Sequence, residues 1–336
     1  MTTRVTSLDV ARAAGVSQSA VSRVFSGASA SAVMTQKVRD AADRLGYRPN
    51  PLARAMITGE SRIIGLAVAY LDNQFYPLAL ERLSKALQAR GYHILVFITS
   101  NAEEGIADTV QQMIDYRVDG IVTASVGMDN HLTRRCAEAG IPVVMFNRGQ
   151  DGGAISSVTS ANAAGGRKVA QFLLEGGHER LAHIAGWQGS STGRDRRAGF
   201  ERGLAEAGAP PPQVIDGLYD RDRAAEAARA LMDGATPPDA IFVGNDHMAF
   251  AVMDALRSAG LSVPGDVSIV GFDDVPLAAW PAYDLTTVRQ PLNRMVEATV
   301  ETLLARINDP ARPTETIEID GPLILRGSAR RPRGPQ

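Results

Sequence analysis

Residues 6–25 read TSLDVARAAGVSQSAVSRVF, and this stretch predicts two short helices joined by a tight turn. Thr6 is placed to cap the first helix, and the acidic Asp9 three residues later completes the pattern of a capping box. Gly15 allows the positive φ that ends this helix, and Ser17 can cap the next one. The stretch therefore predicts a helix-turn-helix, whose second helix enters the major groove of DNA.

The second helix, from Gln18 to Phe25, carries apolar side chains on one face and polar ones on the other. Arginine and glutamine near the start of such a helix can bind the edges of guanine and adenine. Serine hydroxyls can reach phosphate oxygens, which position a helix without reading sequence. The candidate DNA contacts in this segment are Thr6, Ser17, Gln18, Ser19, Ser22 and Arg23.

The charge of the chain is unevenly distributed. Residues 1–60 hold eight Lys and Arg against four Asp and Glu, a balance of about +4, whereas the whole chain is at −2. A basic end on an acidic remainder indicates that nucleic acid meets one end of the protein. A helical pair that binds a protein, or nothing, is the alternative; the turn and the charge together disfavour it.

This N-terminal segment resembles the headpiece of the lactose-repressor (LacI/GalR) family of bacterial transcriptional regulators. The resemblance is carried by VTSLDVARAAGVSQSAVSRVFSG at residues 5–27, by residues 35–47, and by RPNPLARA at residues 48–55. It implies a third helix from Thr35 to Leu45, capped by Thr35 and ended by Gly46. It also implies a hinge helix over residues 51–58, in which Asn50, Ala53 and Met56 contact DNA. Met56 stands where relatives usually carry the leucine that enters the minor groove.

The composition of the chain excludes several classes of protein. Its 336 residues are 45% hydrophobic, enough for a sizeable core, yet no run approaches 18 consecutive apolar residues. The N-terminus has no secretory signal, and a single cysteine, Cys136, excludes an internal disulfide. The five histidines show no metal-binding spacing. We expect a cytoplasmic protein without a membrane span, a metal or another cofactor.

From residue 62 onward, strand-like runs alternate with helical ones. The predicted strands are residues 63–70, 92–99, 120–125, 143–147, 181–185, 240–244, 268–271 and, last, 322–326. The predicted helices include residues 77–90, 105–116, 163–175 and 249–259. This alternation is typical of parallel sheets with helices on both faces, and about 270 residues favour two such sheets. The fold class is therefore a small all-α headpiece plus an α/β body of two doubly wound parallel sheets, and the resemblance implies a body like type I periplasmic binding proteins.

The domain boundaries follow from these assignments. Residues 1–49 form the headpiece, residues 50–61 the hinge helix and linker, and residues 62–328 the effector-binding and dimerisation body. Within the body, one subdomain takes residues 62–161 and 291–321, and the other takes residues 162–290 and 322–328. The resemblance implies that the chain crosses between the two subdomains three times, and we place these crossings near Ala161, Gln290 and Gly321. Residues 329–336, rich in Arg and Pro, are expected to be a disordered tail without heptads.

Polar and aromatic residues follow several of the predicted strands, where ligands of such folds bind. Carboxylates and amides bind hydroxyl groups, arginine holds an oxygen-rich group, and aromatic rings stack on a sugar. In the family, matching positions line the effector pocket. The candidate effector-binding residues are Phe75, Tyr76, Ser125, Asn147, Arg196, Tyr219, Asn245, Asp273 and Gln290.

Three positions depart from the family pattern: Gln74 replaces Pro, Asn147 replaces Asp, and Ala161 replaces Asp. Losing the carboxylate at position 147 removes a strong acceptor for hydroxyl groups. With Arg148, Arg194 and Arg196 near the predicted cleft, a sugar acid is a conceivable effector, although exposed arginines are more often simply solvated.

These features predict a homodimeric transcriptional regulator, most simply a repressor, which binds near-palindromic operator DNA and answers to a sugar or sugar derivative. One alternative is a corepressor-dependent regulator that binds a nucleobase or nucleoside. Another is a serine hydrolase using the GSSTG motif at residues 189–193, with Asp246 and His247; adjacent side chains rarely point at one serine, which disfavours it. A transport-type sugar receptor is opposed by the headpiece and the missing signal peptide.

Overall fold

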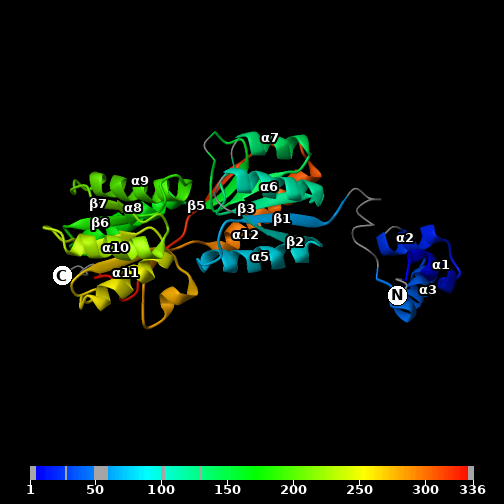
Figure 1. Cartoon of the computed structure of the whole chain (residues 1–336), viewed down its shortest axis with the longest axis horizontal. Coiled ribbons are helices and arrows are strands. Elements are labelled where there is room, and N and C mark those ends of the chain that lie inside the picture. The colour runs from blue at the N-terminus through cyan, green and yellow to red at the C-terminus, as the bar shows by residue number, and fades with distance from the viewer. Residues whose placement is uncertain are drawn as a thin grey trace. The chain divides into compact units, whose positions relative to one another are not determined.

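The computed structural model describes residues 5–26, 29–48, 60–99, 103–128, 130–150 and 152–331. They fall into two compact units, an N-terminal headpiece and a body, divided between Arg62 and Ile63 (Figure 1). Each unit has its own hydrophobic core.

The headpiece consists of three helices, α1 (Ser7–Ala14), α2 (Gln18–Ser26) and α3 (Ala32–Leu45). They pack around a small aliphatic core that includes Val10, Val21 and Val38. The helix-turn-helix predicted from the sequence is therefore present as α1 and α2. The reason is the helical spacing of the apolar side chains, which places one face of each helix against the others.

The predicted caps of the first two helices are confirmed. The Asp9 backbone N–H donates to Thr6 Oγ1 at 3.4 Å, and the Thr6 N–H donates to Asp9 Oδ2 at 2.9 Å. Gly15 has a φ of 66°, and the Ala20 N–H donates to Ser17 Oγ at 3.2 Å. Both ends of the turn are thus held by local hydrogen bonds.

The third helix begins earlier than expected. Ser31 caps it, by accepting a hydrogen bond from the Met34 N–H at 3.3 Å, so the helix starts at Ala32 and not after Thr35. Serine in an extended conformation caps a helix as well as threonine does. The earlier start also places Met34 within the helix, where it packs against the headpiece core. The predicted end at Gly46 is confirmed, with a φ of 64°.

The body contains two six-stranded sheets, each the centre of one lobe (Figure 1). The strands of the first lobe, in spatial order, are β11 (Thr316–Ile319), β5 (Ser156–Ser160), β4 (Val143–Phe146), β3 (Gly120–Ala124), β1 (Ile63–Val68) and β2 (His93–Ile98). Those of the second lobe are β12 (Leu323–Ile324), β10 (Thr286–Arg289), β9 (Ser268–Asp273), β8 (Ala240–Val243), β6 (Leu181–Ala185) and β7 (Gln213–Asp216). Neighbouring strands run parallel, except that β12 is antiparallel to β10.

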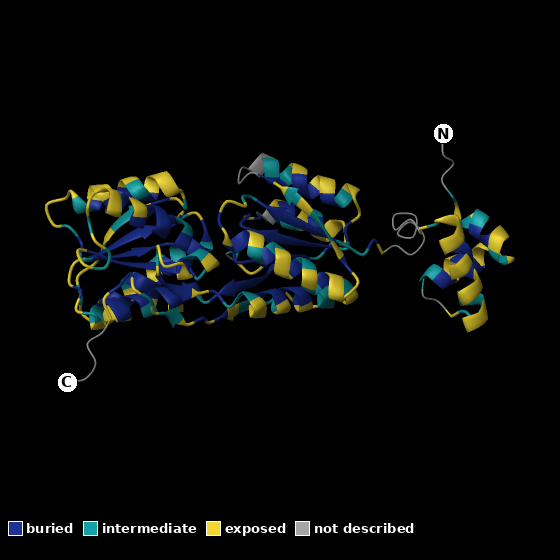
Figure 2. Cartoon of the chain, turned by 90° about the horizontal axis from the view of Figure 1, so that it is seen from below, coloured by how far each residue is buried: buried dark blue, intermediate teal, exposed yellow. Residues whose placement is uncertain are grey.

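Helices cover both faces of each sheet, so that buried strands lie between partly exposed helices (Figure 2). The first lobe has α5 (Phe75–Ala89), α6 (Glu103–Asp115), α7 (Asn130–Glu138) and α12 (Leu292–Asn308). The second lobe has α8 (Asn162–Glu175), α9 (Ser191–Glu206), α10 (Arg221–Met232), α11 (Asp246–Ser258) and the short helix η1 (Pro276–Ala279). The predicted fold class, two doubly wound parallel sheets beside an all-α headpiece, is confirmed.

The chain passes between the lobes three times. It leaves the first sheet after β5 and enters α8 at Asn162, returns after β10 through Gln290 to α12, and leaves again after β11 to form β12. These three segments are adjacent in space because each starts at the end of a strand next to the other lobe (Figure 1).

Several structured segments were not foreseen, among them strands β5, β7, β10 and β11 and the first part of helix α9, and the predicted start of the tail was wrong. Strand β5 has the polar sequence SSVTS, which gives no alternating signal, yet all five residues are buried. Residues 191–206 form α9, which is not among the helices named from the sequence; the Ser190 side chain caps this helix by accepting from the Gly193 N–H at 3.1 Å. The tail begins later than residue 329, because Ala329 is buried and the Arg330 N–H donates to Ser268 Oγ at 3.0 Å.

Helices α8 and α9 touch through their backbones because glycines line their contact. A Cβ added to Gly166 would lie 2.2 Å from the carbonyl oxygen of Arg196, and one added to Gly199 would lie 2.0 Å from that of Ala163. Side chains larger than hydrogen are therefore excluded at both positions. This close packing places the start of α9, and with it Arg196, beside the carboxyl ends of the second sheet.

Candidate functional site

The carboxyl ends of the strands concentrate unusual backbone conformations. Nine non-glycine residues in the described chain have a positive φ, and four of them are candidate effector residues: Ser125 (64°), Asn147 (59°), Tyr219 (62°) and Asp273 (128°). A positive φ is uncommon outside glycine and costs on the order of 1–3 kcal/mol. Such strain clusters at ligand sites, where the surrounding structure holds the side chains in a required direction.

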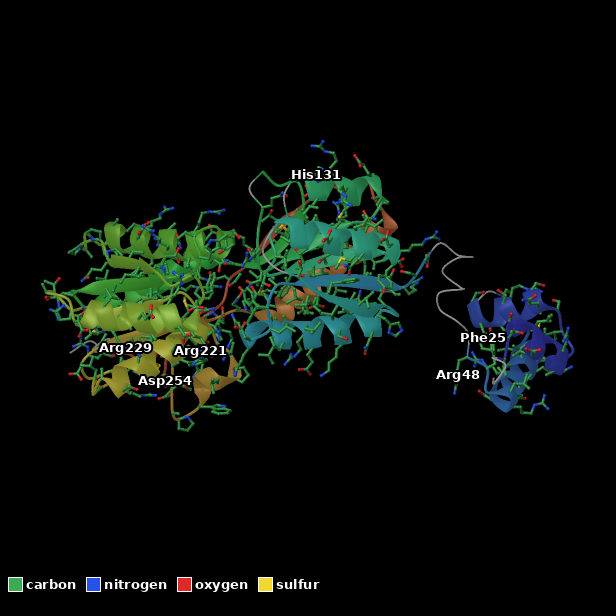
Figure 3. All side chains as sticks on the ribbon, in the orientation of Figure 1. Phe25, Arg48, His131, Arg221, Arg229 and Asp254 are labelled. Atoms are coloured by element: carbon green, nitrogen blue, oxygen red, sulfur yellow. The ribbon has the colours of Figure 1, made fainter. Side chains whose placement is uncertain are left out.

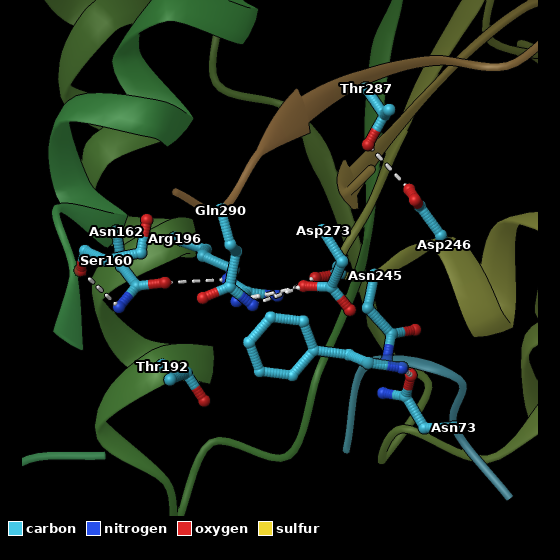
Figure 4. A network of polar contacts seen from close by, with 12 residues as sticks. Asn73, Ser160, Asn162, Thr192, Arg196, Asn245, Asp246, Asp273, Thr287 and Gln290 are labelled. Carbon is cyan, nitrogen blue, oxygen red and sulfur yellow. Dashed lines mark hydrogen bonds and ion pairs between the residues drawn. The ribbon is translucent and has the colours of Figure 1, made fainter. Parts of the chain in front are cut away.

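Arg196 and Asp273 form the centre of a buried polar network (Figure 4). Their side chains are 3% exposed, and Arg196 Nη2 lies 3.4 Å from Asp273 Oδ1. Arg196 also donates from Nε to Asn162 Oδ1 at 2.9 Å and from Nη1 to the Gly244 carbonyl at 2.7 Å. Its guanidinium lies over the Phe272 ring at 3.8 Å. The arginine is therefore fixed on every side by the second lobe.

The network also reaches the first lobe. Asn73, just after β1, is buried, and its side chain lies beside Asp273, where it favours the charged form of that carboxyl and lowers its pKa (Figure 4). Two further contacts join the lobes: the Gly149 N–H donates to Ser191 Oγ at 2.9 Å, and His247 Nε2 lies 3.7 Å from Asp72 Oδ2. A ligand that binds between the lobes would make, break or replace such contacts between strand ends.

A second buried carboxylate lies near Asp273. Asp246, on α11, accepts hydrogen bonds from Thr287 Oγ1 at 2.6 Å and from the Val275 N–H at 3.0 Å. Burial and, after it, the negative charge of Asp273 together raise the pKa of Asp246 to about 7. Burial also raises the pKa of Asp273, to about 6, against the opposing effects of Arg196 and Gln290. Asp246 is therefore the carboxyl group of the pair that keeps a proton more readily.

Asp246→Asn is expected to remove a loss of stability that the protein undergoes as the pH rises. Because the pKa of Asp246 is raised on folding, the folded state holds the proton more tightly than the unfolded state. The stabilisation that comes from protonated Asp246 is thus fully present below about pH 4 and is lost as the pH rises through about 7. The free energy of unfolding changes by no more than about 1.4 kcal/mol per pH unit. Asparagine can accept from the Val275 N–H and donate to Thr287 Oγ1, so the variant should fold.

The measurement is the difference in unfolding free energy between variant and wild type at several pH values from 4 to 8. Burial lowers the pKa of His178, His183 and His247, which gives an opposite slope in both proteins and cancels in the difference. The variant should gain relative to the wild type as the pH rises. A constant difference across this range would show that Asp246 is ionised throughout.

Two more candidates present unsatisfied acceptors. Gln290 donates from Nε2 to Asp273 Oδ1 at 2.7 Å, and the Asn147 side chain lies beside the Tyr76 hydroxyl. Among the described residues, Gln290 Oε1 and Asn147 Oδ1 are buried without a hydrogen-bond partner. A buried oxygen without a donor is costly, and a ligand hydroxyl would supply one.

Ser125 and Asn245 have local structural roles. Ser125 Oγ accepts from the Ala69 N–H at 3.0 Å and so ties the end of β3 to that of β1. Asn245 caps α11 by accepting from the Met248 N–H at 2.9 Å. Both are buried at strand ends, and these hydrogen bonds join them to the chain itself.

The aromatic candidates come from both lobes. Phe75 stacks on Phe146 with ring centroids 6.2 Å apart, and Tyr76 meets Phe75 and Tyr70 edge to face. Tyr219, from the turn after β7, contacts Thr192 through its hydroxyl at 3.1 Å. Phe75 and Tyr76 are buried, whereas Tyr219 is partly exposed.

A cavity of about 510 Å³ opens beside these residues, within the size range of small-molecule sites. Of the nine candidates only Tyr219 lines it; Tyr70, Arg148 and Trp187 line it as well. The other eight are buried. The sequence pointed to Arg148 and Asn73 through their places after strands, and to Trp187 as a ring that could stack on a ligand, whereas Tyr70 and Thr192 gave no chemical signal that separated them from loop residues.

The headpiece candidates all lie on the surface. Thr6, Ser17, Gln18, Ser19, Ser22 and Arg23 are exposed, as contacts to DNA require. Gln18 Nε2 donates to Ser7 Oγ at 2.9 Å, which holds this side chain against α1 and leaves its oxygen as an acceptor. The hinge candidates Asn50, Ala53 and Met56 lie outside the described residues.

The GSSTG motif does not assemble a hydrolase site. Ser191, the serine of the pattern, accepts a hydrogen bond from Gly149 at the start of α9. Asp246 is bound to Thr287 and Val275, and His247 lies beside Asp72. No described contact joins the three side chains, which is the geometry that activates a nucleophile.

Comparison with known proteins agrees with both units. Residues 6–50 match the family described as bacterial regulatory proteins, lacI family, and residues 170–329 match the periplasmic binding protein-like domain. The HTH-type transcriptional repressor PurR of Vibrio parahaemolyticus serotype O3:K6 is 30% identical over 327 residues, which cover 96% of this chain and 98% of that protein. The ribose operon repressor of Escherichia coli (strain K12) gives the same identity and coverage.

The chain belongs to the lacI family of bacterial regulatory proteins. Among solved structures, the lac repressor dimer bound to operator and the anti-inducer ONPF has a TM-score of 0.85 at 26% identity, covering 97% of this chain and 99% of that one. The transcriptional regulator CelR in complex with cellobiose has a TM-score of 0.72 at 30% identity, covering 97% and 100%. The family consists of DNA-binding regulators and not of enzymes, so the hydrolase alternative falls.

Among the described residues, no helix has the length and hydropathy of a membrane span. Within the same residues, no group of three or more His, Cys, Asp and Glu side chains is arranged to hold a metal ion.

Proposed function

We propose that this lacI-family protein is a repressor that binds a near-palindromic operator as a homodimer and answers to a small carbohydrate-type effector. The observation that carries the proposal is the buried network of Arg196, Asp273 and Gln290, which reaches Asn73 in the other lobe. Such a network, beside a cavity of about 510 Å³, ties the relative position of the lobes to whatever binds between them.

The polar groups of the cleft favour a ligand rich in hydroxyl groups. Asp273 accepts hydrogen bonds, and Gln290 Oε1 and Asn147 Oδ1 lack donors among the described residues. Aromatic rings flank these groups, as in many sugar sites. Because Arg196 and Asp273 are 3% exposed, a ligand reaches them when the lobes separate.

A nucleobase or nucleoside is the second candidate. Trp187 lines the cavity and is 39% exposed, so its ring offers a flat surface on which a base can stack. The relatives include repressors named PurR as well as the ribose operon repressor, so family membership is compatible with either class.

Exposed apolar side chains near one sheet edge support the homodimer. At the edge strand β2, Val96 and Ile98 are 39% and 62% exposed, and Tyr116, after α6, is 56% exposed. Exposed apolar side chains at a sheet edge need a cover, and a second copy of the chain supplies one with two-fold symmetry. Two headpieces would then read the two halves of a near-palindromic site.

Coupling follows from linkage between two ligands of one protein. If the effector alters the lobe contacts Asp72–His247 and Asn73–Asp273, it changes the equilibrium between lobe arrangements. An arrangement that favours DNA binding must then bind the effector with a different affinity, by the same factor in both directions.

The test begins with selection of binding sites from genomic DNA by the full-length protein. We expect a near-palindromic motif, bound about tenfold or more weakly by Arg23→Ala, since a good base contact contributes about 1–3 kcal/mol. Ser26→Ala, on the same helix, is the control: its hydroxyl donates to the Arg23 carbonyl at 3.1 Å, and the variant should bind with little change.

The selected operator is then titrated with protein in the presence of neutral sugars, sugar acids and nucleosides. One class should shift the operator affinity, weakening it for induction or strengthening it for corepression. Failure to select any motif would contradict the regulator proposal, and a motif without two-fold symmetry would contradict the homodimer. A response to nucleosides alone would replace the carbohydrate by the second candidate.

A further inference from the structure

We infer that the effector of this regulator carries a carboxylate group and that Arg148 binds it. The inference rests on the proposed function, because it names the chemical class of the ligand that occupies the same cleft. It starts from a contrast between two arginines that are both buried in the body, Arg148 and Arg196.

The charge of Arg196 is already neutralised. It lies 3.4 Å from the carboxylate of Asp273 and donates to Asn162 and to the Gly244 carbonyl. A buried cation with an anionic partner and filled hydrogen bonds is a stable arrangement. Arg196 therefore needs no charged ligand.

Arg148 is equally buried, at 4% exposure, but has no such partner. Its Nε is without a hydrogen-bond acceptor among the described residues, and no described carboxylate forms an ion pair with it. The groups around it are the phenols of Tyr70, Tyr76 and Tyr219 and the ring of Trp187, 5.7 Å from its guanidinium carbon. Phenols are uncharged at neutral pH, so the cation remains uncompensated.

The cavity of about 510 Å³ lies against this cation. Arg148, Tyr70, Trp187 and Tyr219 line its wall. A planar guanidinium presents parallel N–H donors that match the two oxygens of a carboxylate, and neighbouring phenol hydroxyls can donate as well. The wall thus has the donors of an anion site without a resident anion.

The rim of the cavity carries acidic side chains that must be weighed against this assignment. Asp72, Asp220 and Asp222 line it, but they are exposed, and Arg221 and His247 lie among them. Asp72 is 3.7 Å from His247, and Asp220 caps α10 by accepting from the Arg223 N–H at 2.9 Å. Water and salt screen these exposed charges, so the buried Arg148 cation determines the electrostatic potential inside the cavity.

The remaining polar groups describe the rest of the ligand. The unpartnered acceptors Asn147 Oδ1 and Gln290 Oε1 require hydroxyl or amino donors. A molecule with hydroxyl groups at one end and a carboxylate at the other satisfies both needs. The chemical class is a sugar acid; its neutral counterpart would leave Arg148 uncompensated.

The experiment compares matched ligands by isothermal titration of the full-length protein. The pairs are D-glucose and D-gluconate, D-galactose and D-galacturonate, and D-ribose and D-ribonate, with D-glucose 6-phosphate and D-ribose 5-phosphate as phosphate arms. At least one acid should bind about 10- to 100-fold more tightly than its neutral partner, as expected for hydrogen bonds to a charged group.

Variants assign that preference to Arg148. Arg148→Met should remove the preference, and Arg148→Lys should keep part of it, because an ammonium group lacks the planar fork. Arg229→Gln is the control: Arg229 is an exposed arginine near the opposite end of α10 from Arg221 (Figure 3), and its loss should leave the titrations unchanged. Without ligand, Arg148→Met should melt at or above the wild-type temperature, since a buried uncompensated charge is removed.

The outcomes distinguish failure of this inference from failure of the proposed function. Binding of a neutral sugar as tight as that of its acid, an unchanged preference in Arg148→Met, or a lower melting temperature of that variant overturns the inference. A stronger response to the phosphates than to the carboxylates overturns the carboxylate assignment. In each of these cases the proposed regulator stands if the operator is selected and responds to a ligand, whereas failure of operator selection counts against the proposed function.

Discussion

Arg196→Met is expected to lower the free energy of unfolding of the body by about 3–5 kcal/mol, which is the cost of removing one partner of a buried ion pair. Methionine fills a similar volume, but it leaves the Asp273 carboxylate without its cation. Asn162 Oδ1 and the Gly244 carbonyl lose their donor as well. Urea denaturation followed by circular dichroism measures the change.

The next residue along α9 provides a matched control. Arg197 is partly exposed and pairs with Glu201, four residues later, at 2.7 Å. Arg197→Met makes the same chemical change on the same helix, and the expected loss is about 0.5 kcal/mol or less, because water screens the pair. Equal losses in the two variants would show that Arg196 contributes through helix packing and not through its buried charge.

Gly166→Ala is expected to destabilise the body by about 3 kcal/mol, the upper end of the usual cost of overpacking. The added Cβ would lie 2.2 Å from the Arg196 carbonyl oxygen and 2.9 Å from the Phe200 nitrogen, both backbone atoms that cannot turn aside. Helices α8 and α9 must separate to relieve the clash. The expected fall in melting temperature is about 6–12 °C.

The clash at Gly166 should also displace Arg196, which α9 carries into the network. Ligand binding by Gly166→Ala should therefore weaken even at temperatures where the protein is folded. Gly234→Ala is the control, because its nearest neighbour would lie 3.4 Å from the new Cβ, an ordinary contact. If both variants melt together, the backbone contact between α8 and α9 is not rigid.

The headpiece was predictable nearly residue by residue, because its signals are local. Thr6, Gly15 and Ser17 act on neighbours no more than four residues away, through the hydrogen bonds found in the structure. The third helix was the exception: Ser31 competes with Thr35 as its cap, and the sequence offers no measure of which serine or threonine adopts the extended backbone.

The class of the body was predictable from alternation, but individual elements were not. Strand β5 is buried although its sequence is SSVTS, since its neighbours β4 and β11 satisfy its backbone from both sides. Its partner β11 is about 160 residues away in the chain. A strand that is stabilised by such distant pairing leaves no local periodicity to detect.

The contacts between the lobes could not be predicted from the sequence either, because residues such as Asn73 and Asp273 are 200 positions apart in the chain.

The sequence was sufficient for the DNA-binding unit, the family and the types of residue at the strand ends, because these depend on short spacings and on the chemistry of single side chains. It could not distinguish Arg148 from Arg196, since both are arginines near strand ends. Only the folded chain brings Asp273 to one of them and surrounds the other with phenol rings. The ligand class depends on that difference, because the energy of a buried charge is set by its neighbours in space.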